Sequence, residues 1–249
     1  MQHFQLDKSD IIYLDNHLLV VNKPAGVLVQ HDKEGNPNLE DAAKEWLKKE
    51  FNKPGNVFAT ATHRLDRPVG GLVIIARTSK ALARMNAIFA GRGIKKIYLA
   101  LVEGKPESAK HLRHWIKNNE GKNKVWTYTY ERGDARQADL KYWQVQYQSE
   151  ISMLIVRLFT GRHHQIRAQL SFDKTPIAGD SKYGRKNPDL DSPALFSYAI
   201  SFEHPVSREI ISLKAPIPKT GLWGKFAEPS EAALQEALSA DPGLSSSIT

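Results

Sequence analysis

The sequence has no cysteine, which excludes a disulfide scaffold, a cysteine-ligated zinc site and thiol catalysis. No apolar run approaches the ~18 residues that a membrane helix needs. The chain also lacks a P-loop, a G-x-G-x-x-G segment after a predicted strand and a G-x-S-x-G turn, so we expect no cofactor. The N-terminus lacks the basic and then apolar pattern of a secretory signal, and we expect a cytoplasmic protein.

Histidine spacing gives no support for a metal site. His163 and His164 are adjacent and would diverge on a helix, and no H-E-x-x-H segment occurs. His111 and His114 are three residues apart, but no third ligand follows at a suitable spacing. We therefore expect no bound metal.

Basic residues are in excess, and they are unevenly distributed. The chain has 35 Lys and Arg against 27 Asp and Glu, a net charge of +8. Residues 228–249 hold four acidic and no basic side chains, so the first 227 residues carry 23 acids against all 35 bases, a net charge of +12. A basic body of this size favours a polyanionic partner, usually nucleic acid, although a basic enzyme without such a partner is the alternative.

Hydrophobic patterning predicts an α+β fold in which strands outnumber helices. Short turns between the strands favour a mixed, largely antiparallel sheet with flanking helices, within one domain over 1–220. We expect residues 105–150 to form a lobe of the same sheet and 221–249 to form an acidic, loosely packed tail. The predicted helices lie at 39–51, from Thr78 or Ser79 to Gly91, and at 162–172. The predicted strands lie at 11–24 (two, around a turn), 72–76, 94–102, 123–130, 138–148, 151–159, 194–203 and 209–214.

The densest polar cluster is His63-Arg64-Leu65-Asp66-Arg67. In an extended chain Arg64 and Asp66 point to one side and Leu65 points to the other. A carboxylate between two arginines stays ionised, which suits work as a nucleophile or base but not as a general acid. The alternative is a surface ladder of ion pairs.

A second cluster runs from Thr160 to Arg167. Gly161 at the start of a predicted helix can present backbone N–H groups to a phosphate. Arg162 and Arg167 are five residues apart and diverge by roughly 140° on a helix, so one can face RNA while the other reaches an internal carboxylate. The alternative is a solvated helix face with two satisfied histidines.

Six short motifs occur in order between about Asp15 and Pro218. They are Asn22-Lys23-Pro24-Ala25-Gly26, His63-Arg64-Leu65-Asp66, Lys96-Ile97-Tyr98-Leu99-Ala100, Gly161 to Arg167, Pro176 to Asp180 with Tyr183-Gly184, and His204-Pro205. Together these motifs resemble those of the RluA-type RNA pseudouridine synthases. Two positions depart from the family pattern, since Val69 and Gly70 replace its usual Thr and Ser, and no S4-type RNA-binding domain is expected before the first strand.

The resemblance implies the pseudouridine synthase fold, with a central catalytic cleft, and isomerisation of uridine in rRNA or tRNA without cofactor or metal. By resemblance Asp66 is the catalytic aspartate, Tyr98 stacks on the target uracil and Arg167 pairs with Asp66. Arg64 would enter the RNA stack that the uridine leaves. We expect a monomer, with further RNA contacts from the remaining polar residues of these motifs, His63, Arg67, Lys23, Lys96, Arg162 and Gln165.

Two other functions remain open from the sequence. A non-catalytic RNA-binding or RNA-chaperone protein would use the same basic surface without turnover. A metal-dependent nuclease or phosphatase would lose its activity in EDTA.

Overall fold

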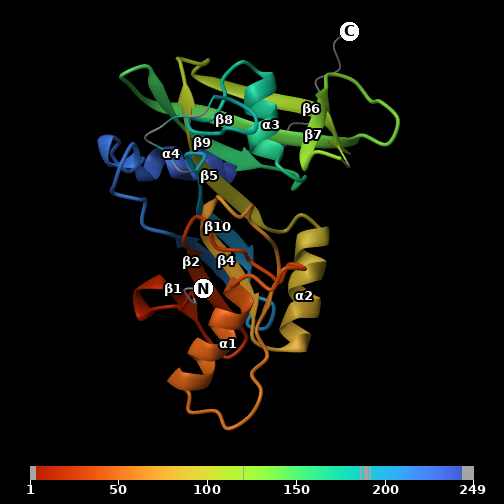
Figure 1. Ribbon diagram of the computed structural model, residues 1–249, viewed down its shortest axis with the longest axis vertical. Helices are drawn as coiled ribbons and strands as arrows, with labels where there is room; N and C mark the ends of the chain where they lie inside the picture. Colours follow the sequence, from red (N-terminus) through yellow and green to blue (C-terminus); the bar gives the residue numbers. More distant parts are fainter. Residues whose placement is uncertain (1–3, 120, 186, 188–189, 191, 243–249) are drawn as a thin grey trace. The chain divides into compact units, whose positions relative to one another are not determined.

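The computed structural model describes residues 4–242 except 120, 186, 188, 189 and 191, and in it the chain divides into two units (Figure 1). Unit 1 combines Met1–Ile94 with Phe196–Pro216, and unit 2 combines Lys95–Leu195 with Ile217–Thr249. The predicted division at residue 220 differs from this one, because residues 196–216 join the N-terminal unit and the C-terminal segment joins unit 2.

Unit 1 is built on a mixed sheet in the order β1-β2-β4-β10, with β3 paired to β4 and β11 paired to β10. The pairing of β4 with β10 is parallel and the others within this unit are antiparallel. The strands are β1 (Ile11–Leu14), β2 (Leu18–Lys23), β3 (Thr60–Ala61), β4 (Gly70–Ala76), β10 (Leu195–Glu203) and β11 (Ile210–Lys214).

The helices of unit 1 agree with the sequence pattern. They are η1 (Lys8–Asp10), α1 (Leu39–Glu50) and α2 (Ser79–Ala90). The side chains of Asn38 and Thr78 cap α1 and α2 by accepting backbone N–H groups. Leu39, Ala43 and Leu47 recur at helical spacing and are buried, as predicted for this amphipathic helix.

Two glycines let β4 approach its neighbours closely. Gly71 has φ +110°, and a Cβ atom there would lie 2.2 Å from the carbonyl oxygen of Ser197 on β10. A Cβ atom on Gly70 would lie 3.1 Å from the carbonyl oxygen of Lys23. The glycine that departs from the family pattern therefore fits a position where the backbones of β4 and β2 nearly touch.

Unit 2 is built on an antiparallel sheet in the order β5-β9-β8-β6-β7. Its strands are β5 (Lys95–Glu103), β6 (Ala109–Asn119), β7 (Lys124–Tyr128), β8 (Arg136–Gln148) and β9 (Ile151–Leu158), and its helices are α3 (Gln165–Phe172), η2 (Trp223–Lys225) and α4 (Glu231–Ser239). Ile116, Val125 and Ala138 pack with Ala168 of α3 on one face of this sheet (Figure 1). Strand β6 was not predicted.

The C-terminal segment contains a packed helix, in contrast to the loosely packed tail that we expected over 221–249. The Ser230 side chain accepts the Ala233 N–H group and begins α4. Leu234 and Ala237 are buried, and α4 contacts β9 and β5. Two apolar residues three positions apart are enough to fix this short helix on the sheet. Residues 243–249 lie outside the described residues.

None of the helices in the described part of the chain combines the length and the apolar composition of a bilayer crossing.

Candidate active site

The predicted site residues fall on both units. In unit 1 they lie at the end of β2 and in the segment before β4, and in unit 2 they lie on β5 and on α3 with the segment before it. Unit 1 carries Lys23, His63, Arg64, Asp66 and Arg67, and unit 2 carries Lys96, Tyr98, Arg162, Gln165 and Arg167.

Asp66 lies in a tight turn that leads into β4. The Val69 N–H group donates to the carbonyl oxygen of Asp66 at 2.9 Å. Arg67 and Gly26 bind each other twice: the Gly26 N–H group donates to the Arg67 carbonyl at 2.8 Å, and Arg67 Nε donates to the Gly26 carbonyl at 3.0 Å. The loop after β2 therefore fixes the backbone next to the carboxylate.

Side chains alternate along this turn as the sequence predicted. Leu65 is buried, Arg64 is exposed and Asp66 is half-buried. The apolar residue thus anchors the segment in unit 1, while Arg64 and the carboxylate lie toward the surface. An accessible carboxylate on a fixed backbone can act as a nucleophile or as a base.

Lys23 is not an RNA contact, contrary to the sequence prediction. Its side chain is completely buried, and Nζ donates to the carbonyl oxygens of Pro24, Val27 and Arg67 at 2.9, 2.8 and 3.3 Å. Burial lowers the pKa of Lys23 to about 7, and the charge of Asp66 partly opposes this shift. The ammonium group therefore links the loop after β2 to the turn at Asp66, and it cannot reach a phosphate.

His63 also contacts the protein backbone. Its Nε2 accepts the N–H group of Ile74 at 3.1 Å, and its ring lies 5.1 Å from that of Phe89. This hydrogen bond ties the segment before Asp66 to β4. The Nε2 atom is thereby engaged, so any contact with RNA would have to use another part of the ring.

Tyr98 occupies the middle of β5 in unit 2. It pairs with Val156 of β9, and only 8% of its surface is exposed. Such a ring is held in place by the sheet and presents an edge or a limited part of its face, because a strand side chain stands perpendicular to the sheet. A fixed aromatic ring with a hydroxyl group can stack on a base and can carry a proton.

Arg167 forms a buried ion pair with Asp180. Nε and Nη2 of Arg167 donate to the two carboxylate oxygens at 2.7 and 2.9 Å, and the side chains are 5% and 1% exposed. Backbone N–H groups of Lys182 and Tyr183 also donate to Asp180. Asp180 belongs to one of the six sequence motifs, but no role for it followed from the sequence. In unit 2 this aspartate fixes the guanidinium.

Tyr183 connects the same guanidinium to the rest of unit 2. Its ring lies 5.3 Å from the Arg167 guanidinium carbon. Its hydroxyl oxygen accepts the Val125 N–H group at 2.8 Å and lies 2.8 Å from His164 Nδ1. Arg167 is therefore positioned by contacts that reach β7 and the segment before α3.

Helix α3 begins at Gln165, three residues later than predicted, because His164 has the left-handed φ of 54°. Gln165 closes this turn, since its Oε1 accepts the Arg162 N–H group and the Thr160 hydroxyl at 2.9 and 2.8 Å. Its Nε2 donates to the Asp139 carbonyl at 3.1 Å. The side chain is buried, so the prediction that Gln165 contacts RNA is wrong.

Arg162 and Lys96 lie near the surface of this turn. Arg162 is half-buried and its Nε donates to the Gln137 carbonyl at 3.0 Å. Lys96 Nζ lies against Gly161, where a Cβ atom would be 3.1 Å away. Burial and the nearby charge of Arg157 lower the pKa of Lys96 to about 8. An anionic group bound near Lys96 and Arg157 would reduce the repulsion between their two positive charges.

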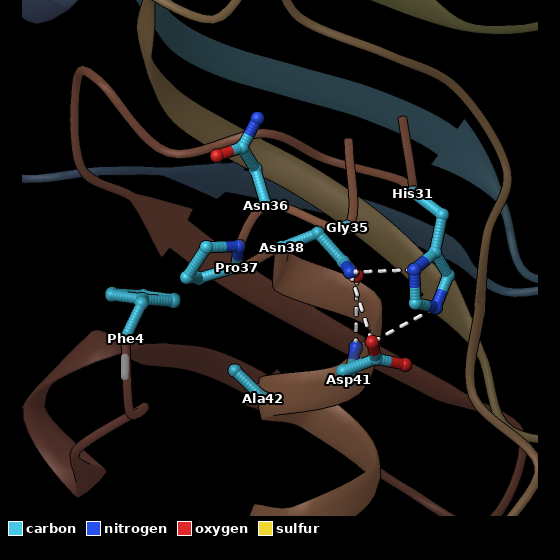
Figure 2. Close-up of a pocket in the computed structure, with 8 residues that line it drawn as sticks. All are labelled: Phe4, His31, Gly35, Asn36, Pro37, Asn38, Asp41 and Ala42. Carbon is cyan, nitrogen blue, oxygen red and sulfur yellow. Dashed lines mark hydrogen bonds and ion pairs between the residues drawn. The ribbon is translucent and has the colours of Figure 1, made fainter. Parts of the chain in front are cut away.

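A pocket in unit 1 lies beside the N-terminus of α1 (Figure 2). It is lined by Phe4, His31, Gly35, Asn36, Pro37, Asn38, Asp41 and Ala42. His31 Nε2 lies 2.9 Å from the carboxylate of Asp41, and the Asn38 side chain both caps α1 and donates to Asp41. Because these polar groups bind one another, we assign them a structural role at the N-terminus of α1.

Comparison with known proteins gives sequence relatives over most of the chain. The family model described as RNA pseudouridylate synthase matches residues 17–172. "Ribosomal large subunit pseudouridine synthase C" of Vibrio parahaemolyticus is 29% identical over 214 residues, covering 83% of this chain and 65% of that protein. Synthase D of Zymomonas mobilis is 30% identical over 223 residues, covering 84% of this chain and 69% of that protein. The chain thus spans about two thirds of the length of these relatives.

A solved structure shares the fold. "Human RNA Pseudouridylate Synthase Domain Containing 1" superposes with a TM-score of 0.72 at 20% identity, covering 97% of this chain and 100% of that chain. The predicted α+β class with a mixed, mostly antiparallel sheet and flanking helices is confirmed.

Proposed function

The chain belongs to the RNA pseudouridylate synthase family, and we propose that it isomerises uridine in RNA to pseudouridine. In this reaction the N1–C1′ bond breaks, the uracil rotates and a C5–C1′ bond forms. C5 loses a proton and N1 gains one, so the composition of the RNA is unchanged and no redox cofactor or metal is required by the balance.

The observation that carries the proposal is the turn at Asp66. Its backbone is fixed by hydrogen bonds to the loop after β2, while its carboxylate is half-buried beside the exposed Arg64. We propose that this carboxylate attacks or deprotonates the ribose as the glycosidic bond breaks. Both roles need an ionised carboxylate.

The other catalytic roles come from unit 2. We propose that Tyr98 stacks on the flipped uracil and assists loss of the C5 proton, and that Arg167 pairs with Asp66. Support comes from the ion pair with Asp180, which fixes the position of the Arg167 guanidinium. Stacking on an aromatic ring returns about 1–3 kcal/mol, which offsets part of the energy needed to flip the base.

We further propose that RNA is held by the basic surface and that Arg64 fills the place vacated by the uridine. A planar guanidinium stacks between bases, which an ammonium cannot do. The substrate is rRNA or tRNA, and the names of the relatives favour large-subunit rRNA. We expect the chain to act on it in the cytoplasm as a monomer, with Arg67, Arg162 and Lys96 among its RNA contacts.

The test is pseudouridine mapping on RNA from cells that lack the gene, incubated with the purified chain. Wild type is expected to create new carbodiimide-reactive sites in EDTA, whereas Asp66→Ala creates none and keeps RNA affinity within a few-fold. Glu45→Ala, at an exposed carboxylate of α1, is the matched control and keeps full activity.

Three outcomes would contradict the proposal. Activity of Asp66→Ala at the wild-type level would remove the assigned role of Asp66. Tight RNA binding by wild type without new sites would indicate the RNA-binding or chaperone alternative. RNA cleavage that stops in EDTA would indicate a metal-dependent nuclease.

A further inference from the structure

One face of the sheet in unit 2 carries aromatic and basic side chains in alternation. Register places Trp115 of β6 opposite Tyr128 of β7, and Lys117 opposite Trp126. Alternation along the paired strand β8 puts Lys141 and Trp143 on this face too, away from Ala138 and α3, and the ion pair of Arg113 with Asp139 lies between them and Trp115. We name this surface the aromatic face and define it by Trp115, Lys117, Trp126, Tyr128, Lys141 and Trp143.

The aromatic face is accessible to solvent. Trp126 is 55% exposed, and the other five residues are half-buried or more exposed. The opposite face of the same strands packs against α3 (Figure 1). An antiparallel sheet with one solvated face normally carries polar residues there. Three tryptophans and a tyrosine on such a face point to a partner.

Cations accompany the rings. The Arg132 guanidinium lies 5.0 Å from the ring of Tyr128, and Lys141 Nζ lies 4.8 Å from the ring of Trp143. Residues 109–148 contain eight Lys and Arg against four Asp and Glu. This composition is complementary to a chain of phosphates that also offers flat apolar surfaces.

We propose that the aromatic face binds a single-stranded segment of the substrate RNA outside the uridine that reacts. This inference rests on the proposed function for the identity of the RNA. Unpaired bases stack on Trp126 and Tyr128, and the interleaved lysines and arginine contact phosphates. Bases inside a duplex cannot offer their faces to these rings, so the surface selects unpaired RNA.

The charge pattern favours RNA over a protein partner. The cores of protein interfaces are depleted of charged residues, particularly lysine. Here Lys117 is the cross-strand partner of Trp126 and also pairs with Asp134, and Lys141 Nζ lies 4.8 Å from the ring of Trp143. Nucleic acid is the partner class that uses both the rings and the cations.

The first experiment measures binding of the full chain to a fluorescein-labelled single-stranded RNA of 20 nucleotides by fluorescence anisotropy. Loss of one stacked base costs about 1–3 kcal/mol, so Trp126→Ala should raise Kd at least about 5-fold, and Trp126→Ala with Tyr128→Ala at least about 25-fold. Trp126→Phe should retain most of the affinity. Tyr147→Ala removes an exposed tyrosine of β8 that is not part of the aromatic face, and should stay within 2-fold.

The same RNA as a perfect duplex is the second arm. Trp126→Ala should change its Kd by less than 2-fold, because no base is free to stack. Lys141→Gln should reduce the salt dependence of single-strand binding by about one unit of slope. Far-UV circular dichroism and the urea midpoint verify that each variant is folded.

The inference is overturned if Trp126→Ala and Tyr147→Ala bind the single strand equally, or if the variants weaken duplex and single strand alike. It is also overturned if the wild-type chain self-associates and Trp126→Ala abolishes only that association. These outcomes are separate from the proposed function: single-strand binding that depends on Trp126 supports the inference even if no pseudouridine forms, and pseudouridine formation with unchanged binding of Trp126→Ala refutes the inference alone.

Discussion

Replacing Asp180 by asparagine should lower the free energy of unfolding by about 3–5 kcal/mol, the range for breaking a buried ion pair. Asparagine has nearly the same size and can still accept the backbone N–H groups of Lys182 and Tyr183. The Arg167 guanidinium, only 5% exposed, would lose its counter-charge. For a chain of this length the melting temperature should fall by roughly 6–20 °C.

Urea unfolding followed by circular dichroism measures this effect, provided that the m-value is unchanged. Arg167→Met with Asp180→Leu replaces the whole pair by apolar groups and should recover most of the loss, since such replacements are often neutral. The control is Glu203→Gln, which breaks the exposed pair with Arg208 and should change stability by less than about 1 kcal/mol. A loss below 1 kcal/mol for Asp180→Asn, or simple additivity in the double variant, would refute the reasoning.

Three further predictions concern stability and binding. Lys23 should contribute about 2 kcal/mol to a rise in wild-type stability from pH 7 to 9, because its pKa of about 7 in the folded state leaves the folded chain with fewer bound protons than the unfolded chain; urea unfolding of Lys23→Met should show a rise smaller by about this amount, the remainder coming from Lys96, and lower midpoints at both pH values. Gly71→Ala should give little soluble protein, since its Cβ would lie 2.2 Å from the Ser197 carbonyl oxygen; normal yield and melting would contradict this. Tyr98→Phe should keep RNA affinity in anisotropy, whereas Tyr98→Ala should lose about 5-fold or more and most turnover; equal behaviour would remove the stacking role.

The regular elements with strong patterns were predictable from the sequence. The apolar run of β4 and the helical spacing of α1 each indicate one structure. Strand β6 was missed because one of its three alternating buried residues, His114, counts as polar, which interrupts the alternation between Leu112 and Ile116. The late start of α3 depends on a left-handed His164, which no periodicity signals.

The candidate site was also predictable from the sequence only in part. The exposure of Arg64 and the burial of Leu65 followed from alternation in an extended chain. Lys23 and Gln165 were misassigned because a polar residue in a motif does not reveal whether it serves a ligand or a backbone group. Both side chains satisfy backbone groups of turns, and only the folded chain identifies those partners.

The discontinuous make-up of unit 1 has a consequence for the order of events during synthesis. Gly71 packs against Ser197, which leaves the ribosome only after the whole of Lys95–Leu195 has been made. At about 5–20 residues per second this is a delay of roughly 5–20 s. Strand β4 therefore gains its neighbour β10 only after most of unit 2 has emerged, and a nascent chain stopped before β10 holds Asp66, Tyr98 and Arg167 while the sheet of unit 1 is still incomplete.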